Sequence, residues 1–81
     1  MRANRAYELI HTRGSLRPAL WAGDERLDLI EVVSIDDGEV ALFWELPARP
    51  ATRLLRTLRT DLATLDAEAF LARWQEAEGE R

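Results

Sequence analysis

The sequence contains no cysteine and no lysine, and it has few residues that are prone to thermal degradation. Without cysteine the chain can form neither disulfides nor thiolate metal sites, which is typical of a cytoplasmic protein. All eleven basic residues are therefore arginine, and together with the abundance of Ala and Leu this indicates GC-rich coding. A single Asn, a single Gln and a single Met complete a thermophile-like composition.

Long apolar runs are also missing from the sequence. No stretch reaches the roughly 20 apolar residues of a membrane helix, and no charged segment followed by an apolar one opens the chain. We therefore expect neither a membrane span nor a signal peptide. The length of 81 residues predicts a single domain, residues 1–81, whose small core leaves little room for a deep active site.

The sequence carries no recognisable motif for catalysis, metal binding or cofactor binding. His11 is the one histidine, and the sequence indicates neither the partner nor the pocket that a general base requires. Asp36, Asp37 and Glu39 lack calcium-loop spacing, so we interpret Asp36-Asp37-Gly38 as a turn. The sequence thus predicts a protein that is not an enzyme and has no cofactor and no metal site.

The stretch from Leu27 to Leu46 predicts a β-hairpin, because two runs rich in β-branched and aromatic residues flank the Asp-Asp-Gly turn. A two-residue loop at Asp37-Gly38 would place Glu31 in the core, where an unpaired carboxylate costs several kcal/mol. We therefore choose a three-residue loop, 36–38, which groups six apolar residues on one face. These residues are Ile30, Val32, Val40, Leu42, Trp44 and Leu46.

Two shorter segments precede the hairpin. Residues 5–13 predict either a short helix, which we favour because both ends carry capping residues, or an edge strand in which Tyr7, Leu9 and His11 share one face. Residues 19–22 predict a short strand that turns into the hairpin. The result is a three-stranded antiparallel meander, with a fourth strand if the first segment is extended.

Two C-terminal helices are predicted to cover one face of this sheet, because three strands with an apolar face are not stable alone. Pro47 and Pro50 end the last strand, with Pro50 at the first position of the helix that follows. Apolar residues of the first helix recur at steps of three and four: Ala51, Leu54, Leu55, Leu58, Leu62 and Leu65. Asp66 caps a second helix with similar spacing: Ala67, Phe70, Leu71, Trp74 and Ala77. The predicted fold is α+β, with Trp44 and Leu58 facing each other across the interface.

Charge is distributed along the chain in blocks of alternating sign. Residues 27–46 carry six acidic and no basic residues, whereas residues 47–60 carry four arginines and no acid. These arginines lie on one flank of the first C-terminal helix without acidic helical neighbours: Arg49, Arg53, Arg56 and Arg59. An anion bound near the helix N-terminus would suit these arginines, but we favour the alternative in which acids elsewhere in the chain or solvent neutralise them.

The second face of the hairpin is predicted to be an interface, because the C-terminal helices cannot reach it. Its apolar members are Leu29, Val33, Ile35, Ala41 and Phe43. We expect the N-terminal segment to cover part of this face and to leave Phe43 for a second copy. The sequence therefore predicts a non-catalytic interaction module that forms a homodimer.

The alternative prediction is an accessory protein that binds a phosphate-bearing ligand or nucleic acid through the arginines. The net charge of −4 argues against general nucleic-acid binding. An acidic protein is a further expected partner of the same arginines.

Overall fold

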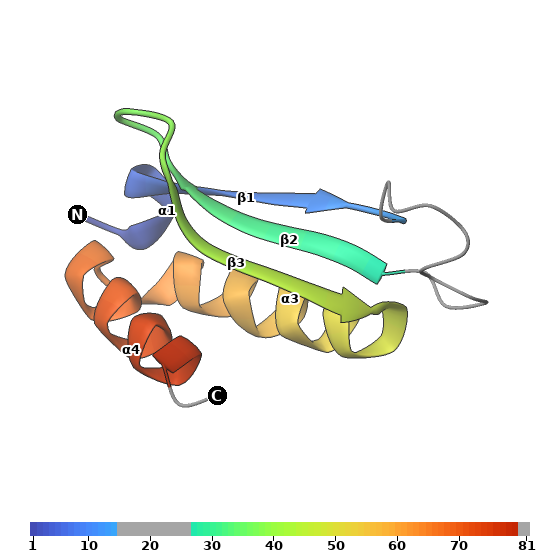
Figure 1. The fold of residues 1–81 in the computed structure, drawn as a ribbon. Helices are drawn as coiled ribbons and strands as arrows, with labels where there is room; N and C mark the ends of the chain where they lie inside the picture. Colours follow the sequence, from blue (N-terminus) through green and yellow to red (C-terminus); the bar gives the residue numbers. More distant parts are fainter. Residues whose placement is uncertain (15–26, 80–81) are drawn as a thin grey trace.

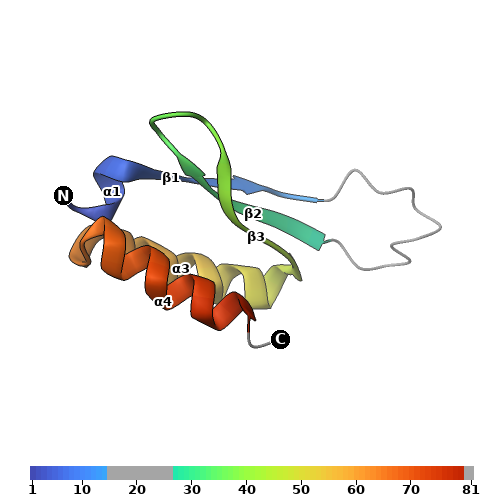
Figure 2. The ribbon, with the colours of Figure 1, turned by 60° about the vertical axis from the view of Figure 1, so that its left-hand side comes forward.

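The computed structural model describes residues 1–14 and 27–79 and shows an α+β fold in two layers (Figure 1). In chain order the elements are α1 (Ala3–Ala6), β1 (Tyr7–Thr12), β2 (Leu27–Ser34), β3 (Val40–Pro47), α3 (Ala48–Thr64) and α4 (Ala67–Gly79). The strands form one antiparallel sheet in the order β1-β2-β3. Both C-terminal helices lie on one face of this sheet (Figures 1 and 2), which confirms the predicted architecture.

The N-terminal segment is mainly a strand, so the favoured helix over residues 5–13 is wrong and the edge-strand alternative is confirmed. Helix is limited to Ala3–Ala6. Tyr7, Leu9 and His11 are the half-buried members of β1, and the residues between them are exposed. Pairing with β2 supplies both backbone hydrogen bonds and apolar contacts, which outweigh the weak capping signals. The strand predicted at 19–22 lies outside the described residues.

The register predicted for the body of the hairpin is confirmed. Ile30 lies opposite Trp44 and Val32 lies opposite Leu42, and all four side chains are buried. Leu46 is partly buried and packs against the same core. Glu31 lies on the other face, as the argument from the cost of a buried carboxylate required.

The connection between β2 and β3 differs from the predicted three-residue loop. Ser34 and Glu39 are joined by a backbone hydrogen bond of 2.8 Å, so residues 35–38 form a four-residue connection. Gly38 has a φ of 76°, a left-handed conformation that glycine adopts without steric cost. Because Val33 pairs with Val40 while Val32 pairs with Leu42, the intervening Ala41 forms a β-bulge.

The bulge restores the register of the hairpin and changes the place of one predicted core residue. One extra residue in β3 compensates for the longer connection, so the pairs beyond it are the predicted ones. Val40, on the turn side of the bulge, pairs with Val33 of the outer face. It is therefore exposed rather than part of the core.

Helix α3 follows β3 directly, with Pro47 as its N-cap residue. Pro50 is thus the third helical residue rather than the first, a position where the missing N–H still costs no helical hydrogen bond. The buried side of α3 consists of Ala51, Leu55, Leu58, Asp61 and Leu62. Apart from Asp61, this is the predicted apolar stripe, with Leu54 and Leu65 at its margins.

Aromatic residues join α4 to the sheet. Trp74 meets Trp44 edge to face with ring centroids 5.7 Å apart, and Phe70 lies 5.8 Å from Tyr7. Trp44 and Leu58 both belong to the single buried cluster between the sheet and the helices. Such aromatic pairs add to the stabilisation that apolar burial gives.

The N-terminal residues are tied to the connection between α3 and α4. The Ala3 N–H donates to the Leu65 carbonyl, and the Ala67 N–H donates to the Met1 carbonyl, both at 2.9 Å. The Arg2 guanidinium donates to the Thr64 carbonyl at 2.8 Å. Ala3 is completely buried in this corner, so its small side chain permits the close approach.

Candidate functional site

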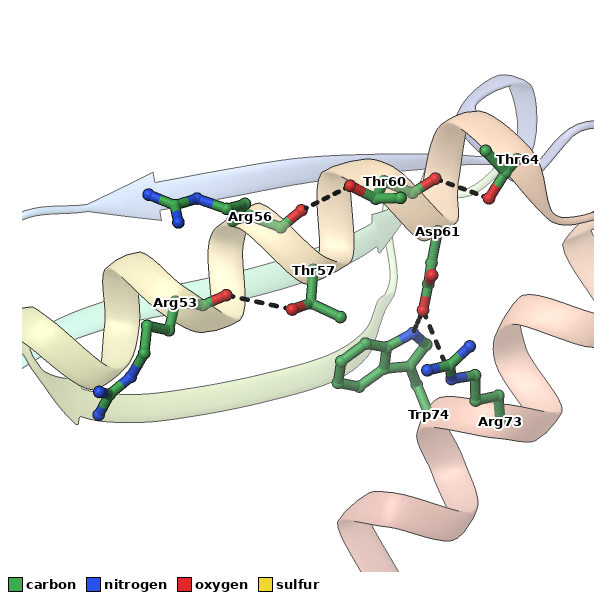
Figure 3. A network of polar contacts seen from close by, with 8 residues as sticks. All are labelled: Arg53, Arg56, Thr57, Thr60, Asp61, Thr64, Arg73 and Trp74. Atoms are coloured by element: carbon green, nitrogen blue, oxygen red, sulfur yellow. Dashed lines mark hydrogen bonds and ion pairs between the residues drawn. The ribbon is translucent and has the colours of Figure 1, made fainter.

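The four arginines of α3 are all exposed, but the structure does not gather them into one patch. Arg56 projects on the β1 side of the helix, whereas Arg53 projects on the β3 side (Figure 3). Arg56 and Arg59 line a pocket between α3 and the end of β1, and neither Arg49 nor Arg53 is among its lining residues. Two of the four predicted arginines therefore line this pocket, and Arg53 lies on the other side of the helix.

None of these four arginines forms an ion pair with another residue within 1–14 or 27–79. Two buried carboxylates near the helix have other partners. Asp28 pairs with His11, and Asp61 pairs with Arg73. Among the described residues, the positive charge of this flank is thus left to solvent or to a ligand.

The pocket has a volume of about 370 Å³. Its lining residues come from the end of β1, the residues that follow it, and the facing side of α3: His11, Arg13, Thr52, Leu55, Arg56, Arg59 and Thr60. Three guanidinium groups and an imidazole therefore surround one hollow. Carboxylates are not among the described lining residues, so the local charge is positive.

The threonines in the pocket wall use their hydroxyl protons within the helix. Thr52 donates to the Ala48 carbonyl at 2.9 Å, and Thr60 donates to the Arg56 carbonyl at 3.1 Å. Figure 3 shows the second of these bonds and the similar bond of Thr57. Since these hydroxyls already donate and His11 Nε2 faces Asp28, the arginines are the main donors that the pocket offers to an anion.

His11 is held by a buried carboxylate on the neighbouring strand. Its Nε2 lies 2.8 Å from Asp28 Oδ2, and the Gly14 N–H donates to the other carboxylate oxygen at 3.2 Å. His11 lies opposite Ile30 in the sheet, so Asp28 is its diagonal neighbour on the core face. Gly14 has a φ of 72°, a conformation suited to glycine in the turn that brings its N–H to Asp28.

Electrostatics at this pair favour the charged carboxylate. The hydrogen bond from His11 lowers the pKa of Asp28 below the ordinary value of 3.8, although burial acts in the opposite direction. The Gly14 N–H and the positive charges of His11 and Arg13 lower this pKa further. A carboxylate with such partners remains ionised and keeps one side of the imidazole fixed.

The sequence interpretation of His11 was wrong in one respect, since the structure provides both a partner and a pocket. The alternation of polar and apolar residues in the sequence already indicated the partner of His11. If residues 7–12 are taken as a strand, His11 falls on the same face as Leu9, and Asp28 falls on the same face as Ile30. An Asp–His pair at the end of the core face then follows from the register of β1 and β2.

A second polar contact joins α3 to α4 behind the pocket. The buried Asp61 accepts a hydrogen bond of 3.0 Å from Trp74 Nε1 and lies 3.5 Å from Arg73 Nε (Figure 3). The indole N–H and the guanidinium compensate for the cost of burying the carboxylate. This cluster therefore has a structural role in fixing the angle between the helices.

The outer face of the sheet is the other candidate surface, and none of the helices within residues 1–14 and 27–79 lies on it (Figure 2). Phe43 is 47% exposed, Ile10 37% and Val40 50%. Leu29 and Val33 are half-buried members of the same face, whereas Ala41, the bulge residue, packs against the core and not on this face as predicted. Ile35 lies in the connection rather than in a strand and is also exposed.

The N-terminal segment does not cover this face, contrary to the prediction. It adds a strand at the edge of the sheet, and Ile10 widens the apolar surface instead of hiding it. Glu31 lies between Ile10 and Phe43, with one of them on each neighbouring strand. The face is therefore apolar with a carboxylate near its middle.

Comparisons with protein-family models, curated proteins and solved structures gave no match. Within the described ranges, no group of three or more histidine, aspartate or glutamate side chains is placed to bind a metal. No helix in the described part of the chain combines the length and apolar character needed to cross a membrane.

The Asp28 pair predicts a specific dependence of stability on pH. Because the pKa of Asp28 is lower in the folded chain than its ordinary 3.8, its stabilising effect is complete above that value and is lost as the pH falls through the folded-state pKa. Asp28→Asn should therefore flatten the acid side of a plot of melting temperature against pH. Asp36→Asn, at an exposed turn position, is the control and should retain the parental slope. Equal slopes for parent and Asp28→Asn would contradict this role.

Proposed function

We propose that the protein is a small non-catalytic interaction module that self-associates through the outer face of its sheet. The observation that carries this proposal is the uncovered face, on which Phe43, Ile10 and Val40 are exposed together. Large contiguous apolar patches are uncommon on soluble monomers and are typical of interaction sites. A second copy presents the same patch, which a two-fold contact sets against itself.

The position of Glu31 limits how two copies can meet. A contact centred on this residue would bury two carboxylates against each other, which is unfavourable without a basic partner. A contact shifted towards β3 instead pairs Phe43 and Val40 with their counterparts.

Phe43→Lys is expected to convert the dimer into a monomer, because it places a charge at the centre of the apolar contact. Light scattering of the parent at tens of micromolar should give about twice the chain mass of 9.3 kDa. The variant should give the single-chain mass with an unchanged far-ultraviolet spectrum, since Phe43 is not part of the monomer core.

Ala72→Lys is the matched control, since it adds the same charge at an exposed position of α4. This variant should remain dimeric. A parent that stays monomeric at high concentration, or a Phe43→Lys variant with the parental mass, would refute self-association through this face.

A further inference from the structure

The pocket between β1 and α3 gathers positive charge from two parts of the chain that are about 40 residues apart in sequence. Arg13 follows β1, while Arg56 and Arg59 belong to α3. Arg56 and Arg59 are also helical neighbours of like charge, an arrangement that destabilises an isolated helix. A bound anion would relieve this repulsion.

We propose that this pocket binds the phosphate group of a small phosphate monoester. Arginine is well suited to phosphate because its planar donors can form paired hydrogen bonds with two oxygens. Three arginines match the double negative charge of a phosphate monoester better than the single charge of a carboxylate. This binding site is independent of self-association, because it lies on the helix side of the sheet.

The size and walls of the pocket favour a small ligand. Its volume of about 370 Å³ lies at the lower end of the range for ligand pockets, roughly 300–1,000 Å³. Leu55 supplies an apolar wall beside the cationic groups. A ligand with one phosphate and a short organic part therefore fits the lining better than an extended nucleic acid.

His11 forms one wall of the site. Its Nε2 lies against the Asp28 carboxylate, which holds the imidazole in place beside Arg13, Arg56 and Arg59.

The test is an amide NMR titration of the full chain with inorganic phosphate and with glycerol 3-phosphate at matched ionic strength. Saturable shifts are expected first at residues 11–14 and 52–60, with the ester binding more tightly than inorganic phosphate. Arg56→Gln and Arg59→Gln should each weaken binding about tenfold, the loss expected for one charge-assisted contact. Arg53→Gln removes the same charge from the other side of α3 and should leave the affinity unchanged.

If Arg53→Gln and Arg56→Gln weaken phosphate binding equally, the anion is held by general charge attraction and the proposal is overturned. Shifts that scatter over the surface, or an oligonucleotide that binds where phosphate does not, would overturn it as well.

Discussion

Trp44→Ala is expected to lower the free energy of unfolding by about 3–5 kcal/mol, the usual cost of truncating a large buried aromatic residue. Trp44 is buried between Ile30 on the neighbouring strand and the edge of Trp74 on α4. Its removal leaves a cavity where the sheet, α3 and α4 meet. For a domain of this size the loss is a large part of the total stability. Chemical denaturation followed by far-ultraviolet circular dichroism measures it directly.

Phe43→Ala is the matched control, because Phe43 is the adjacent residue of β3 and lies on the exposed outer face. In the monomer this change should cost about 1 kcal/mol or less, as expected for a half-exposed side chain. The comparison should be made at a protein concentration below self-association. If the two variants lose similar stability, the register of β3 is not the one described.

Phe70→Ala should lower the free energy of unfolding by a similar amount, about 3–5 kcal/mol, for a different reason. Phe70 is completely buried and its ring lies beside both Tyr7 of β1 and Trp74 of α4. It therefore joins the last helix to the first strand, two elements that are far apart in sequence. Truncation should loosen α4 from the sheet before the sheet itself unfolds.

Hydrogen exchange distinguishes this effect from a uniform loss of stability. In Phe70→Ala the amides of α4 should lose more protection than those of β2. Leu71→Ala, at the neighbouring half-buried position, is the control and should cost clearly less. If Phe70→Ala and Leu71→Ala lower the free energy of unfolding equally, Phe70 is not the anchor of α4.

The fold was largely predictable because its strongest patterns are local. Alternation along 27–46 fixed the register once the cost of burying Glu31 was considered, and leucine spacing defined α3. The N-terminal strand was harder, since residues 7–12 alternate only weakly and capping residues flank them. The β-bulge at Ala41 has no clear sequence signal, because it depends on the length of the connection and the packing of the pairs beyond it.

The candidate site was predicted only in part. The arginines of α3 stood out because the helical spacing revealed them, but spacing within one helix does not show which of them meet another element. Arg13 joins Arg56 and Arg59 only through the position of β1 beside α3. The contact between His11 and Asp28 likewise depends on pairing between two strands. A helix over residues 5–13, which we favoured from the sequence, does not predict it.

The tie between residues 1–3 and the α3–α4 connection determines when folding can be completed. Its hydrogen bonds join parts of the chain that are more than 60 residues apart, so they form only after α3 has been synthesised. The β2–β3 hairpin, by contrast, consists of neighbouring segments and can pair as soon as they are available. Residues 1–3 are thus among the last of this domain to reach their final contacts, and Ala3 stays exposed until α3 and the connection to α4 pack against it.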